Sequence, residues 1–375
     1  MKLYRETIPE DHFSCEFFLM SDSTLRQAAE ALAIGQSIGN PAVRSKYETL
    51  EMMENHSAKI IGNPDDLEKM SSGIVEIAWP YRNIDWYADG IAQLMCTVMG
   101  GQMDIDIIKQ CHWIDVNIDR GKSGLKMPSY GLSGFRNHVQ SYEKPLLGTI
   151  VKPKTGLTAD TLRDIVQQMV DGGVDFIKED EIMSNPACLP LEERISIVQP
   201  ILESYDTVYC YCINSDPHTL MDKARAVSQS GGMGVHINFW SGMGSYKAIR
   251  DEDNGTFIHF QKSGDKVLTS KHNAYRIEWS VMCKLAGLIG CDTIHAGMYG
   301  GYMDMGYEEL KNIQNICLEQ NMVPAFSCGM TKELIPVIRE KFGNDWMANV
   351  GGAVHSHPNG IRAGVEELRA VIDNG

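Results

Sequence analysis

The sequence predicts an α/β protein in which a small α+β domain precedes a (β/α)₈ barrel. From Pro145 onward, strand-like and helix-like runs alternate in a regular order, and eight of these runs read as strands. Such an alternation is typical of a parallel sheet that closes into a barrel. The 375 residues suffice for one small domain and a barrel of roughly 250 residues. We therefore divide the chain into residues 1–125 and 126–375.

The first of these segments mixes strand and helix signals without the βα alternation, which indicates an α+β domain. Its expected elements are a helix over 23–34, a strand over 73–80, a helix or buried strand over 91–99, and a partly alternating segment over 107–118. Glycine and serine residues over 121–133 predict a linker, and a short helix is expected over 133–140.

The barrel segment contains eight short apolar runs, each followed by a longer run with helical spacing. The predicted strands are 146–151, 174–177, 207–213, 234–239, 256–260, 293–296, 323–327 and 346–350. The predicted helices are 158–171, 191–204, 219–230, 244–251, 273–287, 307–320, 330–342 and 360–372.

Charged side chains follow the second predicted barrel strand. Lys178 and Asp180 point to the same face because side chains alternate along a strand, and Glu181 lies where the strand opens into a loop. Such charges are costly to bury unless they are paired or bind a cation. Carboxylate oxygens suit Mg²⁺, and a carbamate formed by CO₂ on Lys178 could add a third oxygen ligand. Taken alone, this stretch is equally compatible with a charged edge that faces solvent.

A second charged stretch comes one βα unit earlier. Lys152 and Lys154 lie on one face at the end of the first predicted barrel strand. Charged residues at the carboxyl ends of two consecutive strands are the pattern of a (β/α)₈ barrel active site.

Together, the two stretches resemble the signature segments of the ribulose-bisphosphate carboxylase large-subunit superfamily, which contains true carboxylases and RuBisCO-like proteins. The pattern is a Lys-Pro-Lys strand end followed about 18 residues later by Gly-Gly-x-Asp-Phe-x-Lys-x-Asp-Glu. The resemblance extends over residues 125–375 and more loosely over the first 120. It implies a ferredoxin-like α+β N-terminal domain ahead of the barrel.

The resemblance also assigns roles to these charged residues. It implies that Lys178 becomes a carbamate and joins Asp180 and Glu181 as a ligand of Mg²⁺. Lys152 resembles the lysine that assists enolisation, and Lys154 resembles its partner near the metal.

The later predicted strands end in polar or glycine-rich motifs, each of which alone is more often structural. Backbone N–H groups of a glycine loop can bind phosphate. In the order in which they occur, these motifs match the superfamily. The match implies that two histidines surround the substrate's carbon backbone and distal phosphate, namely His259 and His295. It implies hydroxyl- and phosphate-binding roles for Ser327, Gly329, Gly351 and Gly352.

Several positions depart from the true carboxylases. Those enzymes have an arginine directly after the first histidine, where this chain has Phe260, and Lys262 is the nearest cation. They also have a lysine in the mobile loop seven residues after the second histidine, where this chain has Tyr302. That lysine helps to stabilise the carboxylated intermediate, so capture of CO₂ is the step that we expect to be lost.

Two N-terminal stretches depart as well. The carboxylase glutamate that pairs with the loop lysine is missing from residues 35–41, and Asn40 and Pro41 replace a phosphate-contacting threonine and tryptophan. The methionine-salvage enolases have an N-terminal lysine next to a glycine, and residues 99–102 contain none. The resemblance is therefore closest to a RuBisCO-like (form IV) protein that matches no single known branch.

Composition restricts the partners that we expect. The formal net charge of −15 argues against nucleic acid or an anionic membrane. The N-terminus has no apolar signal segment, and no apolar run reaches 18 residues. The ten cysteines have no zinc-type spacing and predict free thiols in a reducing cytoplasm.

The leading hypothesis is a Mg²⁺-dependent enolase, isomerase or decarboxylase (a lyase) that acts on a small phosphorylated ketose or keto acid without fixing CO₂. One alternative is a ribulose-1,5-bisphosphate carboxylase with atypical loop residues, in which Lys262 or Lys266 replaces the lost cations. Another is a non-catalytic sugar-phosphate-binding protein. The superfamily's shared active sites imply a homodimer or a multiple of dimers.

Overall fold

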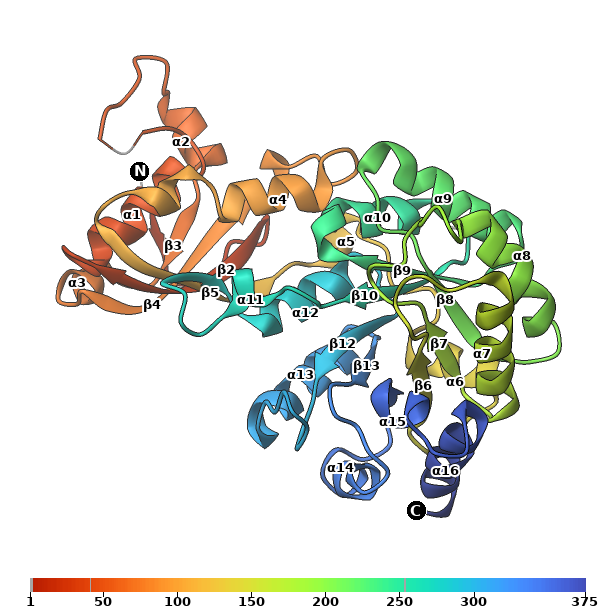
Figure 1. The fold of residues 1–375 in the computed structure, drawn as a ribbon. Helices are drawn as coiled ribbons and strands as arrows, with labels where there is room; N and C mark the ends of the chain where they lie inside the picture. The colour runs from red at the N-terminus through yellow and green to blue at the C-terminus, as the bar shows by residue number, and fades with distance from the viewer. Residues whose placement is uncertain (1–2, 41, 253) are drawn as a thin grey trace. The chain divides into compact units, whose positions relative to one another are not determined.

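The computed structural model describes residues 3–40, 42–252 and 254–375 (Figure 1), so Pro41 lies outside the described residues. The chain forms two compact units, which are described separately. The first comprises Met1–Leu125 and Gly264–Leu285, and the second comprises Lys126–Ser263 and Ala286–Gly375. Residues 264–285 thus fold with the first unit, although the sequence division placed them in the second.

The first unit is built on a six-stranded mixed sheet with the order β1-β3-β4-β2-β5-β11. Its strands are β1 (Tyr4–Arg5), β2 (His12–Ser21), β3 (Lys59–Ile61), β4 (Ser72–Pro80), β5 (Ile108–Asn117) and β11 (Tyr275–Ile277). Its helices are α1 (Leu25–Gly35), α2 (Leu50–His56), α3 (Pro64–Glu68), α4 (Gly90–Val98), α5 (Arg120–Ser123) and α11 (Lys266–Thr269), with 3₁₀ turns η1 (Tyr81–Asn83) and η2 (Gly101–Asp104). The prediction of a small α+β domain is confirmed.

Alternation along β2 explains how this sheet packs. Phe13, Phe17 and Leu19 are buried on one face of the strand. Helix α1 begins after Thr24, whose side chain accepts a hydrogen bond from the backbone N–H of Gln27. The buried side of α1 packs against β2 and β4 and so covers the sheet.

The second unit contains a closed parallel barrel with the strand order β6-β7-β8-β9-β10-β12-β13-β14. Its strands are β6 (Leu146–Ile150), β7 (Phe176–Lys178), β8 (Val208–Cys212), β9 (Gly234–Asn238), β10 (Phe257–Gln261), β12 (Thr293–Gly297), β13 (Val323–Phe326) and β14 (Met347–Val350). Each lies at a predicted strand, so the prediction of a (β/α)₈ barrel is confirmed.

Helices surround this barrel (Figure 1). They are α6 (Gly131–Val139), α7 (Ala159–Asp171), α8 (Leu191–Leu202), α9 (Pro217–Gln229), α10 (Met243–Asp251), α13 (Tyr307–Glu319), α14 (Leu334–Phe342), α15 (Gly352–His355) and α16 (Ile361–Asn374), with the 3₁₀ turn η3 (Phe239–Ser241). No helix in the described ranges is both long and apolar enough to cross a membrane.

One predicted helix, 273–287, is wrong in its first part. Residues Tyr275–Ile277 form β11, which pairs in parallel with β5, and helix α12 (Trp279–Leu288) begins only afterwards. The three-residue strand is too short to show an alternation, and its partner is far away in the sequence. Pairing satisfies backbone groups that a helix would have satisfied locally.

Side chains fill the barrel in layers that alternate between strands, as is usual for this fold. The bottom of the barrel is apolar and includes Leu146, Val208, Phe257 and Val323. Two layers above the bottom, His259 of β10 lies in one layer with three small residues, namely Gly148, Cys210 and Ala325. Above them, the strand register places four buried polar residues in one layer, which we call the polar layer: Lys178, His236, His295 and Asn349.

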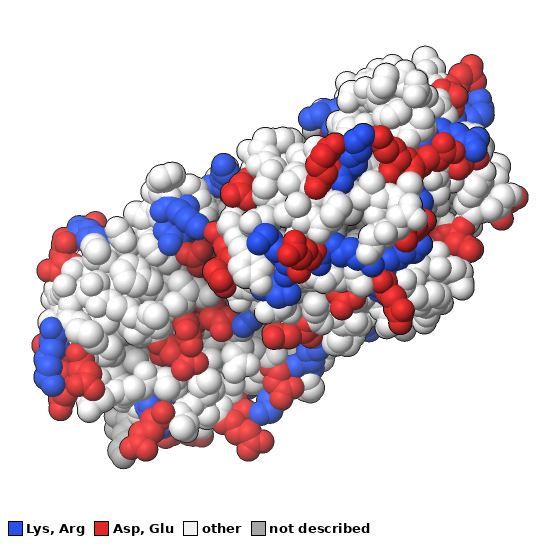
Figure 2. Space-filling view, turned by 90° about the horizontal axis from the view of Figure 1, so that it is seen from below, with Lys and Arg blue, Asp and Glu red and all other residues white. Residues whose placement is uncertain are grey.

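On the surface view of Figure 2, acidic and basic side chains are interspersed. Such mixing is typical of a solvated protein surface and produces no broad field of one sign on that face.

Candidate active site

The carboxyl end of β7 brings together the lysine and two carboxylates expected from the sequence. Lys178 is fully buried, and its Nζ lies 3.8 Å from Glu181 Oε2 and donates a hydrogen bond to the backbone oxygen of Glu179. Asp180 is also buried and forms an ion pair with Lys152, which reaches over from the loop after β6. Burial lowers the pKa of Lys178, so its ammonium group loses a proton more readily than that of an exposed lysine.

Glu181 is held by two neutral side chains that the sequence analysis did not identify. Its Oε2 accepts a hydrogen bond from Gln261 Nε2 and its Oε1 accepts one from Ser263 Oγ, both at 2.9 Å. Burial alone would raise the pKa of Glu181, but the charge of Lys178 and the hydrogen bonds from its own backbone and from Ser263 outweigh it and lower the pKa to about 2. The carboxylate is therefore ionised across the physiological pH range.

The donor set fits Mg²⁺ only with help from Lys178. In the described parts of the chain, no three His, Cys, Asp or Glu side chains are grouped so that they could hold a metal ion. Asp180 and Glu181 supply two carboxylates, and Lys178 lies beside Glu181 as a buried amine. A carbamate on this amine would supply the third oxygen ligand, and Mg²⁺ would keep several waters.

A second buried ion pair lies on the outer face of β7 and fixes the backbone that carries Asp180 and Glu181. Glu179 accepts hydrogen bonds from Arg194 Nε at 2.8 Å, Tyr209 Oη at 3.0 Å and the Cys212 backbone N–H at 2.7 Å. The guanidinium also donates to the backbone oxygen of Ser184, beyond the carboxylates. This network ties β7 and its loop to α8 and β8.

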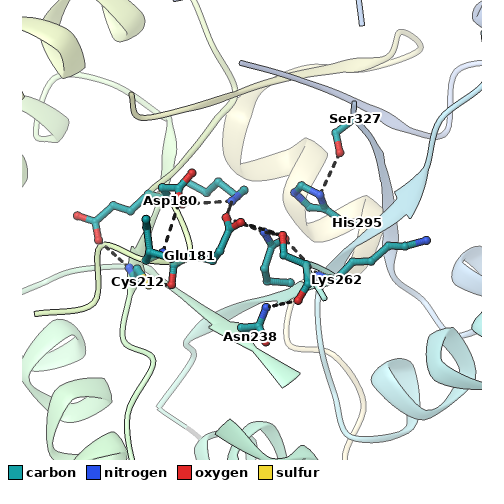
Figure 3. Close-up of polar contacts among 12 residues, drawn as sticks. Asp180, Glu181, Cys212, Asn238, Lys262, His295 and Ser327 are labelled. Carbon is teal, nitrogen blue, oxygen red and sulfur yellow. Dashed lines mark hydrogen bonds and ion pairs between the residues drawn. The ribbon is translucent and has the colours of Figure 1, made fainter. Parts of the chain in front are cut away.

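His295 lies at the carboxyl end of β12 between two polar side chains. Its Nδ1 and Ser327 Oγ are 3.0 Å apart (Figure 3). Its Nε2 is 3.0 Å from Asn349 Nδ2. Because the Asn349 amide donates to Nε2, the proton of the neutral ring is on Nδ1 and points to Ser327. Burial, with the charge of Lys178, lowers the pKa of His295 well below its usual value.

His259 lies inside its strand, whereas the sequence analysis, which predicted a strand over 256–260, placed it near the strand's end. Strand β10 continues to Gln261, so His259 is two residues deeper and fully buried, with its ring 4.9 Å from that of His295 and 5.5 Å from that of Phe176. Gln261 is the strand-end residue on the same face, and Lys262 follows directly. Period-two alternation from His259 was the signal that could have identified Gln261.

His236 of β9 was also missed. Its ring lies 5.4 Å from that of His259, and neither imidazole has a hydrogen-bond partner among the described residues. Burial lowers the pKa of both rings, so both are neutral.

The remaining expected residues lie around the same end of the barrel. Lys152 is partly buried and Lys154 is exposed, both in the loop after β6. Gly351 and Gly352 follow β14 directly, where no side chain restricts the space around Gly352. Gly329 has φ +106°, and a Cβ there would lie 2.8 Å from the backbone nitrogen of Tyr302.

The loop after β12 therefore passes directly over the segment that follows β13. The Tyr302 side chain is 80% exposed at this loop. The side chain of Lys262 points away from Asp180 and Glu181 (Figure 3). The carboxyl end of the barrel thus combines the carboxylates of Asp180 and Glu181, several lysines and the buried neutral ring of His295. The exposed side chain of Tyr302 lies in the neighbouring loop.

The comparisons with known proteins agree on one family. The family model for the ribulose bisphosphate carboxylase large chain, catalytic domain, matches residues 131–323. A ribulose bisphosphate carboxylase of Pyrococcus furiosus is 29% identical over 365 residues, which cover 92% of this chain and 84% of that protein. A 2,3-diketo-5-methylthiopentyl-1-phosphate enolase of Bacillus pumilus is 26% identical over 371 residues, which cover 94% and 89% of the two proteins.

A solved structure agrees with these relatives. The octameric ribulose-1,5-bisphosphate carboxylase/oxygenase of Pyrococcus horikoshii OT3, crystallised with sulfate ion, superimposes with a TM-score of 0.89 and 26% identity. The superposition covers 99% of this chain and 90% of that one. Since the family model matches more than half of the chain and this fold agrees throughout, the chain belongs to the ribulose bisphosphate carboxylase large-chain family.

Proposed function

We propose that this protein is a RuBisCO-like, Mg²⁺-dependent enzyme that enolises a small phosphorylated ketose or keto acid. The product would arise by tautomerisation, isomerisation or decarboxylation, without fixation of CO₂. The observation that carries this proposal is the joint presence of Lys152, Lys178, Asp180 and Glu181 at one end of the barrel, with Tyr302 in the adjoining loop. These residues would supply a metal site and a nearby cation for enolisation, whereas position 302 of the loop offers no cation for a carboxylated intermediate.

Mg²⁺ would be held by Asp180, Glu181 and the carbamate of Lys178, and would supply Lewis-acid polarisation of a carbonyl and its enolate. The Nζ of Lys152 lies against Asp180. From this position it would stabilise the substrate oxygen that becomes negatively charged in the enolate. Lys154, exposed in the same loop, is the second amine available to substrate.

The substrate's hydroxyl and phosphate groups would bind on the opposite side of the barrel mouth. His295 Nδ1–H donates to Ser327 Oγ, and the Ser327 hydroxyl, which also contacts Cys328 Sγ at 3.8 Å, would turn its proton toward a substrate oxygen. Gly329, Gly351 and Gly352 present backbone without side chains, which suits a phosphate group. His259 would act from beneath, through the ring of His295, rather than by touching the substrate.

The experiment is a panel of ketose and keto-acid phosphates, including a 2,3-diketo phosphate, incubated with MgCl₂ and bicarbonate in D₂O. Proton NMR would follow exchange at the carbon next to the carbonyl, together with release of CO₂. Exchange without CO₂ indicates an enolase or isomerase, and CO₂ release indicates a decarboxylase. Lys178→Ala should abolish the reaction, and full activity in that variant would refute the proposal.

A carboxylase is the second candidate, because relatives such as the Pyrococcus furiosus protein carry that name. Lys262 follows the strand-end residue Gln261 directly and is the cation best placed to replace the missing arginine. Incorporation of labelled CO₂ into ribulose bisphosphate tests this directly. A protein that binds Mg²⁺ but neither exchanges a proton nor incorporates CO₂ would instead be a sugar-phosphate-binding protein.

We also propose a homodimer, or a multiple of dimers, in the cytoplasm. The similar Pyrococcus horikoshii structure is octameric, and the ten cysteines here are all free. Light scattering coupled to size-exclusion chromatography would measure the mass, and a monomer at micromolar concentration would contradict the assembly.

A further inference from the structure

Four polar side chains at the ends of consecutive barrel strands form a closed circuit of hydrogen bonds that begins and ends on Glu181. We propose that this circuit, made of Asn214, Asn238, Gln261 and Ser263, positions Glu181 as a preformed metal ligand. The inference rests on the proposed function, because it concerns the Mg²⁺ site. These four are positioning residues that act through Glu181.

The circuit first fixes the backbone of Glu181. Asn214, which follows β8, donates through Nδ2 to the backbone oxygen of Glu181. Its Oδ1 accepts the backbone N–H of Asn238, at the end of β9, at 2.7 Å. Asn238 Nδ2 in turn donates to the backbone oxygen of Ser263 at 2.9 Å, after β10. The loops after β7, β8 and β10 and the end of β9 are thereby linked in series.

The circuit then closes on the side chain of Glu181. Ser263 Oγ donates to one carboxylate oxygen, Gln261 Nε2 donates to the other, and Gln261 Nε2 also contacts Ser263 Oγ at 2.9 Å. Backbone and both carboxylate oxygens of Glu181 are therefore held at once. Each carboxylate oxygen can accept more than one hydrogen bond or ligand bond, so both remain able to bind a cation.

The two carboxylates of the site consequently differ in how they are held. Asp180 is paired with the cationic Nζ of Lys152, a partly exposed group that competes with a metal ion for the same oxygen. Glu181 takes its side-chain hydrogen bonds from neutral donors, which need not leave when a cation arrives. Outer-shell hydrogen bonds of this kind orient metal ligands, and their loss typically weakens metal affinity by roughly 10- to 100-fold.

A purely structural role for the circuit makes a different prediction. If it only joined the four strand ends, its loss would lower thermal stability and leave the intrinsic metal affinity unchanged. Ser263 is exposed, so Ser263→Ala removes the closing hydroxyl with little loss of packing. Ser215 offers a matched control, because it also follows β8 in the same region but its hydroxyl donates to the backbone of Ile213 rather than to Glu181.

The test measures Mn²⁺ as a probe for the Mg²⁺ site. Binding is followed by electron paramagnetic resonance of free Mn²⁺, with bicarbonate present, in the wild type, Ser263→Ala, Gln261→Leu, the double variant, Ser263→Thr and Ser215→Ala. The melting temperature is recorded without metal. We expect the double variant to bind Mn²⁺ about 10- to 100-fold more weakly than the wild type. Ser263→Thr, which keeps the hydroxyl, should retain the wild-type affinity, and so should Ser215→Ala.

Equal Mn²⁺ affinity in the wild type and the double variant would overturn the circuit's role while leaving the proposed function intact. A lower melting temperature with unchanged affinity would overturn it in the same way, in favour of a structural role. A wild type that binds no Mn²⁺ would overturn the proposed metal site itself, so the two failures are distinguishable.

Discussion

At the scale of single residues, the depressed pKa of Glu181 makes a prediction for the metal-free protein. Its pKa of about 2 lies below the ordinary value of 4.5, because the charge of Lys178 and local hydrogen bonds outweigh burial. A group with a lowered folded-state pKa adds stability above its unfolded pKa and loses it as the pH falls. We expect the wild type to lose more stability between about pH 4.5 and pH 2 than Glu181→Gln, measured by urea unfolding. Parallel pH profiles would contradict this.

His236 gives a second prediction at this scale. Both of its ring nitrogens are buried and have no partner among the described residues. Leaving a buried polar group unpaired costs about 1–3 kcal/mol, whereas an apolar group of similar size carries no such cost. His236→Leu should therefore leave the unfolding free energy unchanged or raise it by about 1 kcal/mol. A loss of more than about 2 kcal/mol would mean that the ring makes hydrogen bonds to buried water.

The site residues divide by what a sequence pattern can specify. The proximity of Lys178, Asp180 and Glu181 was predictable, because charged side chains at the end of an apolar strand are costly to bury unless they are paired or bind a cation. Ser263 and Asn238 were not, because each becomes significant only when four strands are brought into one register. A polar residue after a strand is ordinary, and the sequence contains no signal for what lies opposite it.

At the scale of elements, β7 is supported on its outer face by the Glu179–Arg194 pair. Both side chains are fully buried, with 2.8 Å between Arg194 Nε and Glu179 Oε1. Removing one partner of such a pair leaves an uncompensated buried charge and costs about 3–5 kcal/mol, whereas replacing both by apolar residues is often nearly neutral. We expect Arg194→Met to lose that much stability in urea unfolding.

The control for this prediction is the double variant Arg194→Met with Glu179→Leu. It should recover much of the lost stability, because no buried charge is left without a partner. If the double variant is as unstable as Arg194→Met, the additional hydrogen bonds to Tyr209, Cys212 and Ser184 matter more than the charge pair itself.

Element prediction succeeded where apolar runs were long enough to show a period, as in the eight barrel strands. It failed for β11, whose three residues include an exposed tyrosine and pair with a strand more than 150 residues earlier in the chain. It also ended β10 one residue early, because Gln261 is polar although it is buried. The sequence analysis took the first polar residue as the end of the buried strand, but Gln261 is both polar and buried.

At the scale of the whole molecule, the chain passes from the second unit into the first and back. After β10 it enters the first unit, adds β11 to the edge of that sheet beside β5, and returns through α12 to β12. Unfolding the first unit therefore frees both ends of an insertion that interrupts the barrel between β10 and β12. The barrel strands β10 and β12 pair directly, so both ends of this insertion are attached to neighbouring strands of the barrel.

This connectivity predicts that the two units unfold together. Trp79 is buried in the first unit and Trp346 in the second, so each can report on its own unit. In variants in which Trp79 or Trp346 is the only one of the six tryptophans that remains, urea unfolding followed by fluorescence should give the same midpoint within error. If Trp79 reports a transition at clearly lower urea than Trp346, the inserted segment does not couple the units, and the barrel is stable without the first unit. Coincident midpoints would mean that a destabilising change in the sheet, far from Glu181 in the sequence, also lowers the stability of the barrel end that carries Glu181.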